Sequence, residues 1–298
     1  MTHTQRFFSI IIPTYNRPGQ LTACLQSLTC LSYPRDCFEV IVVDDGSMVT
    51  PEAVIAPFRE QLAVTLLWEP NAGPATARNL GAMKARGTFL AFTDDDCQPT
   101  SDWLQALAGR FAEDQDCMIG GRTINALPDN PYSRASQLLI DYLYAYYNVD
   151  PDRARFFTSN NLAVAAERFR AIRGFDTTFP RSAAEDREFC DRWLTQGYRM
   201  RYVPEAIVHH AHVLTYQKFM RQHFWYGRGA FAFHRIRGSR GTGRMKVEPM
   251  AFYRDLLRYA FLHERGVKGL LLGVLLIGAQ VANISGFVWE RLNEKRGQ

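Results

Sequence analysis

Three consecutive aspartates, Asp94, Asp95 and Asp96, follow an apolar segment of the chain. Crowded carboxylates repel one another, and the arrangement is unfavourable unless a cation neutralises it. Their oxygens are the hard ligands that Mg²⁺ and Mn²⁺ prefer, and such an ion can in turn bind a substrate diphosphate. The structural alternative is a solvated turn that caps a helix, because aspartate is also common there. The position at the end of a predicted strand favours the metal site.

A second acidic pair, Glu185 and Asp186, opens a predicted helix. One carboxylate of the pair could act as a general base that deprotonates an acceptor hydroxyl. Acidic side chains in a first helical turn also stabilise the helix dipole, which is a purely structural role. The residue types and their position leave both roles open.

Further polar side chains follow two other apolar segments. Asp44 and Asp45 precede Gly46, and Asp-Gly is a common turn former, yet a carboxylate here could also accept hydrogen bonds from a nucleobase or ribose. The segment after the first apolar run either begins a helix or contacts the same ligand. It offers an aromatic ring, an amide and a cation in the run Pro13, Thr14, Tyr15, Asn16 and Arg17.

A third polar group lies at the start of a predicted helix and contains Asn71, Gly73 and Arg78. Arg78 could pair either with a phosphate or with the aspartate cluster. Three histidines after the last predicted strand could offer one imidazole to a metal ion: His209, His210 and His212.

The elements that must position these side chains alternate between strand and helix. Apolar runs rich in β-branched and aromatic residues predict four strands, at residues 7–12, 38–43, 64–68 and 89–93. A helix is predicted at 74–86. This alternation is typical of an α/β protein with a doubly wound, mostly parallel sheet. Ligands bind at the carboxyl ends of such strands, where residues 14–17, 44–45 and 94–96 fall.

The pattern is less regular in the second half of the chain. Residues 122–157 are rich in tyrosine, and we expect them to be irregular. Two strands are predicted at 162–165 and 199–203, the second ending before Pro204. Two helices are predicted near 167–172 and 186–196.

The composition indicates a folded protein. The chain has 298 residues, of which 47% are hydrophobic and 22% charged, enough for one sizeable core. The six cysteines form no CxxC pair, and the N-terminal segment lacks the apolar run of a secretory signal. We therefore expect a cytoplasmic protein with reduced thiols. No nucleic-acid-binding motif accompanies the basic residues, so nucleic acid is not expected as a partner.

Charge and hydropathy change near residue 213. Residues 1–212 carry 20 Lys/Arg and 25 Asp/Glu, whereas residues 213–268 carry 12 and 3. The uncharged segment 269–289 is long enough to span a bilayer as a helix, although its glycines and polar residues also suit a buried helix. We expect a catalytic domain at 1–215 and a basic helical region at 216–298, with 269–289 associated with the inner face of a membrane or packed on the catalytic domain.

Several motifs occur in an order that is specific as a set. They are Ile-Ile-Pro-Thr-Tyr-Asn-Arg at 11–17, Val-Val-Asp-Asp-Gly-Ser at 42–47, Asn-Ala-Gly-Pro-Ala-Thr-Ala-Arg-Asn at 71–79, Phe-Thr-Asp-Asp-Asp-Cys at 92–97, Gly-Phe-Asp at 174–176, Glu-Asp at 185–186 and Pro-Glu-Ala-Ile-Val-His-His at 204–210. Over roughly residues 6–215 the chain resembles the family 2 glycosyltransferases of the GT-A fold.

The resemblance implies roles for individual residues. Asp94 and Asp96 would hold a divalent cation, Mg²⁺ or Mn²⁺, and His210 would complete its shell if the register excludes His209. Asp186 would be the catalytic base. The remaining residues would bind the nucleotide sugar: Pro13, Thr14, Tyr15, Arg17, Asp44, Asp45, Asn71, Gly73, Arg78, Asp95 and Glu185.

The implied reaction moves a sugar, with inversion, from a nucleotide donor (a UDP-sugar as first guess) to a hydroxyl of a glycan or lipid-linked acceptor. Polysaccharide, glycolipid or cell-envelope glycan synthesis would use it. The Gln-x-x-Arg-Trp motif of processive enzymes is missing, which favours single transfers. A sugar nucleotidyltransferase is the alternative, but residues 13–19 are poor in glycine. A scaffold with a degenerate sugar-nucleotide site is another, but Asp94, Asp96 and Asp186 are intact.

Overall fold

The computed structural model describes residues 6–179, 183–241 and 248–294. These residues form two compact units that are interleaved along the chain. The first unit contains residues up to 124 together with 148–177 and 189–211. The second contains 125–147, 178–188 and the residues from 212 onward. The expected division into domains at 1–215 and 216–298 stays a prediction.

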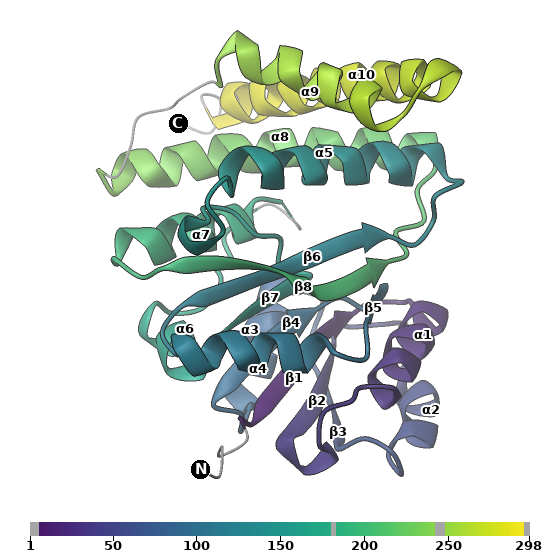
Figure 1. The fold of residues 1–298 in the computed structure, drawn as a ribbon, viewed down its shortest axis with the longest axis vertical. Coiled ribbons are helices and arrows are strands. Elements are labelled where there is room, and N and C mark those ends of the chain that lie inside the picture. The colour runs from purple at the N-terminus through teal and green to yellow at the C-terminus, as the bar shows by residue number, and fades with distance from the viewer. Residues whose placement is uncertain (1–5, 180–182, 242–247, 295–298) are drawn as a thin grey trace. The chain divides into compact units, whose positions relative to one another are not determined.

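A sheet in the strand order β3-β2-β1-β4-β7-β6-β8-β5 forms the centre of the first unit (Figure 1). Its parallel half comprises β1 (Phe8–Thr14), β2 (Phe38–Asp44), β3 (Val64–Trp68) and β4 (Phe89–Thr93). Every residue of β1, β2 and β4 is buried, as is typical of strands covered on both faces. These are the four strands that the apolar runs predicted, and the predicted α/β fold class is confirmed.

The other half of the sheet contains antiparallel pairs. Strand β7 (Asn161–Ala165) pairs with β4 and with β6 (Met118–Asn125), and β8 (Met200–His210) pairs with β5 (Cys97–Pro99). In the last pair Cys97 lies opposite His210. This register brings the end of β8 beside the segment that follows β4.

Helices accompany the strands of the first unit. They are α1 (Pro18–Thr29), α2 (Glu52–Ile55), α3 (Pro74–Lys84), α4 (Trp103–Glu113), α6 (Ala166–Ala171) and, from its second turn, α7 (Glu185–Thr195), with short 3-10 turns at Arg35–Cys37, Ala56–Phe58 and Pro151–Arg153. Both α1 and α3 begin with proline, whose fixed φ and missing N–H suit a first helical turn. Before α3, Gly73 has φ 96°, a conformation that favours glycine.

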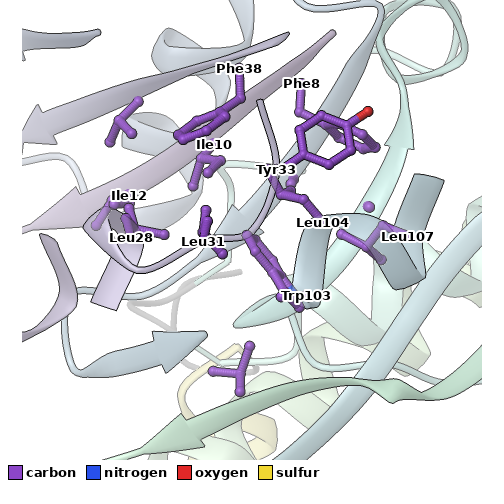
Figure 2. Close-up of a cluster of buried hydrophobic side chains, with 14 of the residues drawn as sticks. Phe8, Ile10, Ile12, Leu28, Leu31, Tyr33, Phe38, Trp103, Leu104 and Leu107 are labelled. Atoms are coloured by element: carbon purple, nitrogen blue, oxygen red, sulfur yellow. The ribbon is translucent and has the colours of Figure 1, made fainter. Parts of the chain in front are cut away.

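The largest apolar core lies between the sheet and helices α1 and α4. Figure 2 shows Phe8 and Ile10 of β1 facing side chains from other elements, among them Leu28 and Trp103. These four side chains have no solvent-accessible surface. Burying a side chain of this kind stabilises a fold by roughly 1.5–3 kcal/mol. The core therefore fixes the strands whose ends carry the polar groups.

The second unit is helical and contains α5 (Pro131–Tyr147), α8 (Tyr216–Ser239), α9 (Met250–His263) and α10 (Gly266–Glu294). A separate apolar cluster joins all four, with Leu138 from α5, Phe219 from α8, Leu256 from α9 and Leu276 from α10. Helices α8 and α10 also touch through their backbones. A Cβ atom at Gly227 would clash with the carbonyl oxygen of Asn283, and one at Gly286 with that of Phe224.

Two expectations about local structure were wrong. Residues 122–157 are not irregular, because β6 extends to Asn125 and α5 occupies Pro131–Tyr147. The last strand does not end before Pro204 but continues to His210. Proline lacks an N–H and is tolerated where a strand is not paired on that side. Pro204 is exposed and lies outside the pairing with β5, which covers Val208–His210.

Candidate active site

The carboxyl ends of β1, β2 and β4 lie side by side, since β1 pairs with both of the others. The polar residues that follow β1 and β4 contact each other. Thr14 Oγ1 donates a hydrogen bond to Asp95 Oδ2 at 2.8 Å, and Arg17 Nη1 lies 3.1 Å from both Asp95 Oδ1 and Asp96 Oδ2. The structure therefore brings Thr14 and Arg17 into contact with Asp95 and Asp96 at this edge of the sheet.

Asp95 is the most buried of the three aspartates, with 3% of its surface exposed. Burial raises the pKa of its carboxyl to about 6, and the charges of Asp96 and Asp94 add to this shift. The Arg17 guanidinium and the hydroxyl of Thr14 act in the opposite direction. Asp95 is thus held inside the protein and fixes the segment after β1 to the segment after β4.

Asp96 contacts His210, whose Nε2 lies 3.2 Å from Asp96 Oδ1. The pairing of β5 with β8 causes this contact, because it places the residue after Asp96 opposite His210. Burial lowers the pKa of His210, but the hydrogen bond to Asp96 and the charges of Asp96 and Asp94 raise it above its ordinary value. His209 is exposed and lies opposite Gln98 instead.

Asp96, Cys97 and His210 each offer one ligand atom, and the three atoms lie within 4.8 Å of one another. A carboxylate and an imidazole suit a divalent cation such as Mn²⁺. Burial raises the pKa of the Cys97 thiol well above its usual range, and a hard divalent cation prefers oxygen and nitrogen ligands to sulfur. Asp96 and His210 are therefore the two side chains of this cluster that fit a metal ion.

Asp94 has a different partner. Arg78 Nη2 lies 2.6 Å from Asp94 Oδ1, and the guanidinium lies 5.8 Å from the centroid of the Phe175 ring. Arg78 is almost fully buried, whereas 28% of the Asp94 side chain is exposed. Of the two roles that the sequence left open for Arg78, the geometry shows the contact with the aspartate cluster.

Asp44 and Asp45 do different things although they are adjacent. Asp45 holds the loop before α3, because its carboxylate accepts hydrogen bonds from the backbone N–H groups of Ala72 and Gly73 and from the side chain of Asn71. Asp44 Oδ1 accepts one from the N–H of Ser47 at 2.9 Å. Asp44 Oδ2 is buried and has no hydrogen-bond partner among the described residues.

The loops after β1 and β2 are tied together in a way that the sequence did not reveal. Asn16 has φ 54°, and its backbone N–H donates to Ser47 Oγ at 2.8 Å. Asn16 Oδ1 accepts from the N–H of Met48 at 2.9 Å. Asn16 thus clamps these loops, and the neighbouring Tyr15 is 46% exposed. The Asx-type pattern was the available signal, since asparagine tolerates positive φ.

Glu185 and Asp186 form the first turn of α7 and belong to the second unit. Glu185 is buried and Asp186 is half-buried. Asp186 Oδ1 accepts a hydrogen bond from the N–H of Arg187 at 2.7 Å. The residue before the helix, Ala184, has φ 71°, which is uncommon for a residue other than glycine. Such backbone strain is often found at functional sites.

The second unit also contains an open cavity of about 780 Å³. Its lining comes from residues 126–132 and 213–216 and includes Tyr132 and Tyr216, whose ring centroids are 6.1 Å apart. Half of the Tyr216 side chain is exposed. Two neighbouring aromatic rings on an accessible surface can stack on the apolar face of a sugar ring.

The chain is similar in sequence to known glycosyltransferases. The model of "Glycosyl transferase family 2" matches residues 9–175, more than half of the chain, and that of "Glycosyl transferase family group 2" matches residues 93–289. The pre-mycofactocin glycosyltransferase of Mycobacterium tuberculosis is 29% identical over 232 residues, which cover 76% of this chain and 47% of that protein. The chain thus spans about half the length of this curated relative.

Two solved structures share the fold. One is the mannosyltransferase PcManGT of Pyrobaculum calidifontis in complex with GDP-Man and Mn²⁺, with a TM-score of 0.63 at 20% identity. The matched region covers 94% of this chain and 74% of the PcManGT chain. The other is S. aureus TarS 1-349 in complex with UDP-GlcNAc, with a TM-score of 0.54 at 17% identity. The matched region covers 98% of this chain and 92% of the TarS chain. The motifs at 11–17, 42–47 and 92–97 lie at the ends of β1, β2 and β4, and the family model matches most of the first unit. The chain therefore belongs to glycosyl transferase family 2.

Proposed function

We propose that the protein transfers a sugar from a nucleotide-diphosphate donor to an acceptor hydroxyl, with inversion at the anomeric carbon. The observation that carries this proposal is a pair of features at the ends of β2 and β4, the two strands that flank β1. Asp96 and His210 offer metal ligands beside β4, and the buried Asp44 Oδ2 at the end of β2 has no hydrogen-bond partner among the described residues. One donor molecule with a diphosphate and a nucleobase would use both.

Asp44 is the proposed recognition point for the nucleotide. A buried carboxylate oxygen without a partner is unfavourable, and a ligand N–H or O–H that reaches it removes this cost. An imide N–H of a base or a ribose hydroxyl would fit. Tyr15, Arg17, Asn71 and Gly73 would line the pocket, and the UDP-sugar remains our first choice of donor. The solved relatives hold GDP-Man in one case and UDP-GlcNAc in the other.

Asp96 and His210 are the proposed metal ligands, with Asp94 as the other carboxylate of the Asp-x-Asp motif. A divalent cation bound there would neutralise charge on the departing nucleoside diphosphate. Arg78 holds Asp94, and Arg17 bridges Asp95 and Asp96, so each carboxylate keeps a fixed position before the donor arrives. PcManGT, solved with Mn²⁺, supports the choice of a divalent cation.

Asp186 is the proposed general base. Its carboxylate would accept the proton of the acceptor hydroxyl while the acceptor oxygen bonds to the anomeric carbon and the bond to the diphosphate breaks. Displacement in line would invert the anomeric configuration. The hydrogen bond from the N–H of Arg187 to Asp186 Oδ1 holds the carboxylate at the first turn of α7.

The acceptor is proposed to bind at the cavity lined by Tyr132 and Tyr216, with a glycan or a lipid-linked sugar as the class. The rings would stack on a pyranose. One sugar would be added per encounter, since the motif typical of processive enzymes is missing from the sequence.

A panel of nucleotide sugars tests the proposal. With Mn²⁺ present, we expect one donor to be hydrolysed slowly without an acceptor and to release its nucleoside diphosphate. A nucleotidyltransferase would instead release pyrophosphate from a nucleoside triphosphate and a sugar phosphate. Binding of a donor without turnover under any condition, by a folded protein, would identify a scaffold.

A further inference from the structure

Helix α10 exposes an apolar face to solvent. From residue 270 to residue 289 its exposed positions are Leu270, Leu271, Val274, Ile277, Val281, Ile284, Ser285, Val288 and Trp289, which we call the outer stripe. Ser285 is its one polar member. The solvent face of a helix normally carries charged and polar side chains, and a large apolar surface marks a site of interaction. We therefore expect an apolar partner surface to cover the outer stripe.

The opposite face of α10 is packed inside the second unit. Leu272, Leu275, Leu276 and Ala279 belong to the apolar cluster shared with α5, α8 and α9. The backbone contacts at Gly227 and Gly286 add a close approach to α8. Figure 1 shows α8, α9 and α10 running alongside one another. Helix α10 is long and apolar enough to cross a membrane by length and composition, but a crossing helix surrounded by lipid would lose all these contacts.

The two ends of the outer stripe carry positive charge. The acidic side chains there are engaged in ion pairs within the unit: Glu264 with Arg134, Glu290 with Arg228 and Glu294 with Arg235. Arg265, Lys268 and Arg291 are exposed and form no ion pair with a residue that the structure describes. An apolar stripe with free cations at both ends complements a lipid surface, in which anionic headgroups lie above apolar acyl chains.

An aromatic cluster lies at the C-terminal end of the stripe. The guanidinium of Arg228 lies 4.2 Å from the ring centroid of Trp225 and 4.2 Å from that of Trp289. Trp289 is 45% exposed. Indole rings are enriched at the boundary between lipid headgroups and acyl chains, because one part of the ring is apolar and the N–H is polar.

We propose that α10 docks the protein on an anionic lipid surface and lies in the plane of that surface without crossing it. The outer stripe enters the boundary between headgroups and acyl chains, and Arg265, Lys268 and Arg291 contact the headgroups. The inner face stays packed on α5, α8 and α9. This proposal does not depend on the transfer reaction, so either can fail while the other holds.

Flotation of the full chain with vesicles of phosphatidylglycerol and phosphatidylcholine tests the docking. We expect the wild type to float and Ile277→Glu/Ile284→Glu to lose affinity about tenfold or more, because two apolar side chains leave the lipid boundary. Both positions are exposed, so folding is not threatened, and circular dichroism checks it. The control is Val149→Glu, an equally apolar and exposed residue in the first unit, which is expected to float like the wild type.

The headgroup contacts have a separate readout. Lys268→Gln and Arg291→Gln should each weaken binding to anionic vesicles about fivefold, with a smaller effect in high salt. Wild type that stays at the bottom of the gradient overturns the proposal. So does a lipid-free dimer that Ile277→Glu/Ile284→Glu converts to monomer, because the outer stripe would then belong to a second copy.

The in-plane orientation is tested by the depth of nitroxide labels in vesicle-bound protein. Single cysteines replace Leu270, Ile277 and Ile284 in a chain whose partly accessible Cys30 and Cys37 are serine. Equal depths for the three labels support a helix in the surface plane. Depths that change by roughly 10 Å for every seven residues would show a crossing helix and overturn the proposal.

Discussion

Asp44 and Asp45 show how much the surroundings of a residue decide beyond its type. The sequence presents two adjacent aspartates with the same candidate roles. In the structure both oxygens of Asp45 bind the loop at residues 71–73, whereas Asp44 keeps a buried oxygen without a partner among the described residues. No rule of spacing distinguishes them, because the loop that engages Asp45 arrives from another part of the chain.

Substituting Asp44 and Asp45 one at a time by asparagine tests these different roles. Asp44→Asn keeps the oxygen that binds the Ser47 N–H but presents an NH₂ donor where the proposed nucleotide needs an acceptor. We expect the Kd of the nucleoside diphosphate, measured by calorimetry, to rise about tenfold or more, since roughly 1–3 kcal/mol is lost at an unsatisfied buried group. Asp45→Asn should instead lower the Tm with a smaller effect on Kd. The reverse pattern would exclude Asp44 as the nucleotide contact.

Asp186 gives a second prediction at this scale. Asp186→Asn removes the proposed base and keeps the side-chain size, so kcat should fall by roughly 10²–10⁴-fold while the donor Kd stays within a factor of two or so. Glu185→Gln is the neighbouring control and should retain more activity. A fully active Asp186→Asn variant would return this residue to its structural role at the start of α7.

At the level of elements, one buried carboxylate connects β1, β2 and the end of α3. Glu39 accepts hydrogen bonds from Ser9 Oγ at 2.7 Å and from the backbone and side chain of Arg86, both at 2.8 Å. Burial would raise the pKa of Glu39, but these hydrogen bonds and the Arg86 charge lower it below its ordinary value of 4.5. The ionised form is therefore stabilised by folding.

The pH dependence follows from this sign. A folded-state pKa below the unfolded one gives stability that is present above about pH 4.5 and is lost as the pH falls through the folded value. Glu39→Gln should lower the free energy of unfolding by about 1–3 kcal/mol at pH 7. This difference from wild type should become smaller as the pH falls and the Glu39 carboxylate of the wild type becomes protonated. Urea unfolding at several pH values measures this, and a difference independent of pH would contradict it.

Helices α8 and α10 offer a comparison between two glycines. Gly227→Ala would place a methyl group against the backbone of α10 and should cost about 1–3 kcal/mol of stability through overpacking. Gly238→Ala, in the same helix, meets open space and should be neutral or stabilise by about 0.5–1 kcal/mol. Thermal unfolding of the two variants measures both effects. Equal Tm values would mean that α8 and α10 do not rely on this contact.

At the scale of the whole molecule, the sequence was most informative where structure is local. The strands at β3 and β4 were predicted to the residue, because their apolar runs are bounded by turn residues. Helix α5 was missed because its buried positions are largely tyrosine and small residues, and the side chains that cover Leu138 and Tyr142 come from α8–α10. The contact of His210 with Asp96 also depends on strand pairing between distant segments.

The interleaving of the two units also constrains how the chain can be made. Helix α5 is translated long before α8, α9 and α10, which supply most of the apolar surface that its buried face packs on. During synthesis that face stays uncovered while roughly a hundred more residues emerge, which at about 5–20 residues per second lasts several seconds or more. We expect a nascent chain of this kind to bind chaperones that recognise exposed apolar helices. A fragment that stops near residue 215 lacks α8, α9 and α10, so the apolar face of α5 would never be covered. We expect such a fragment to accumulate in the insoluble fraction on expression.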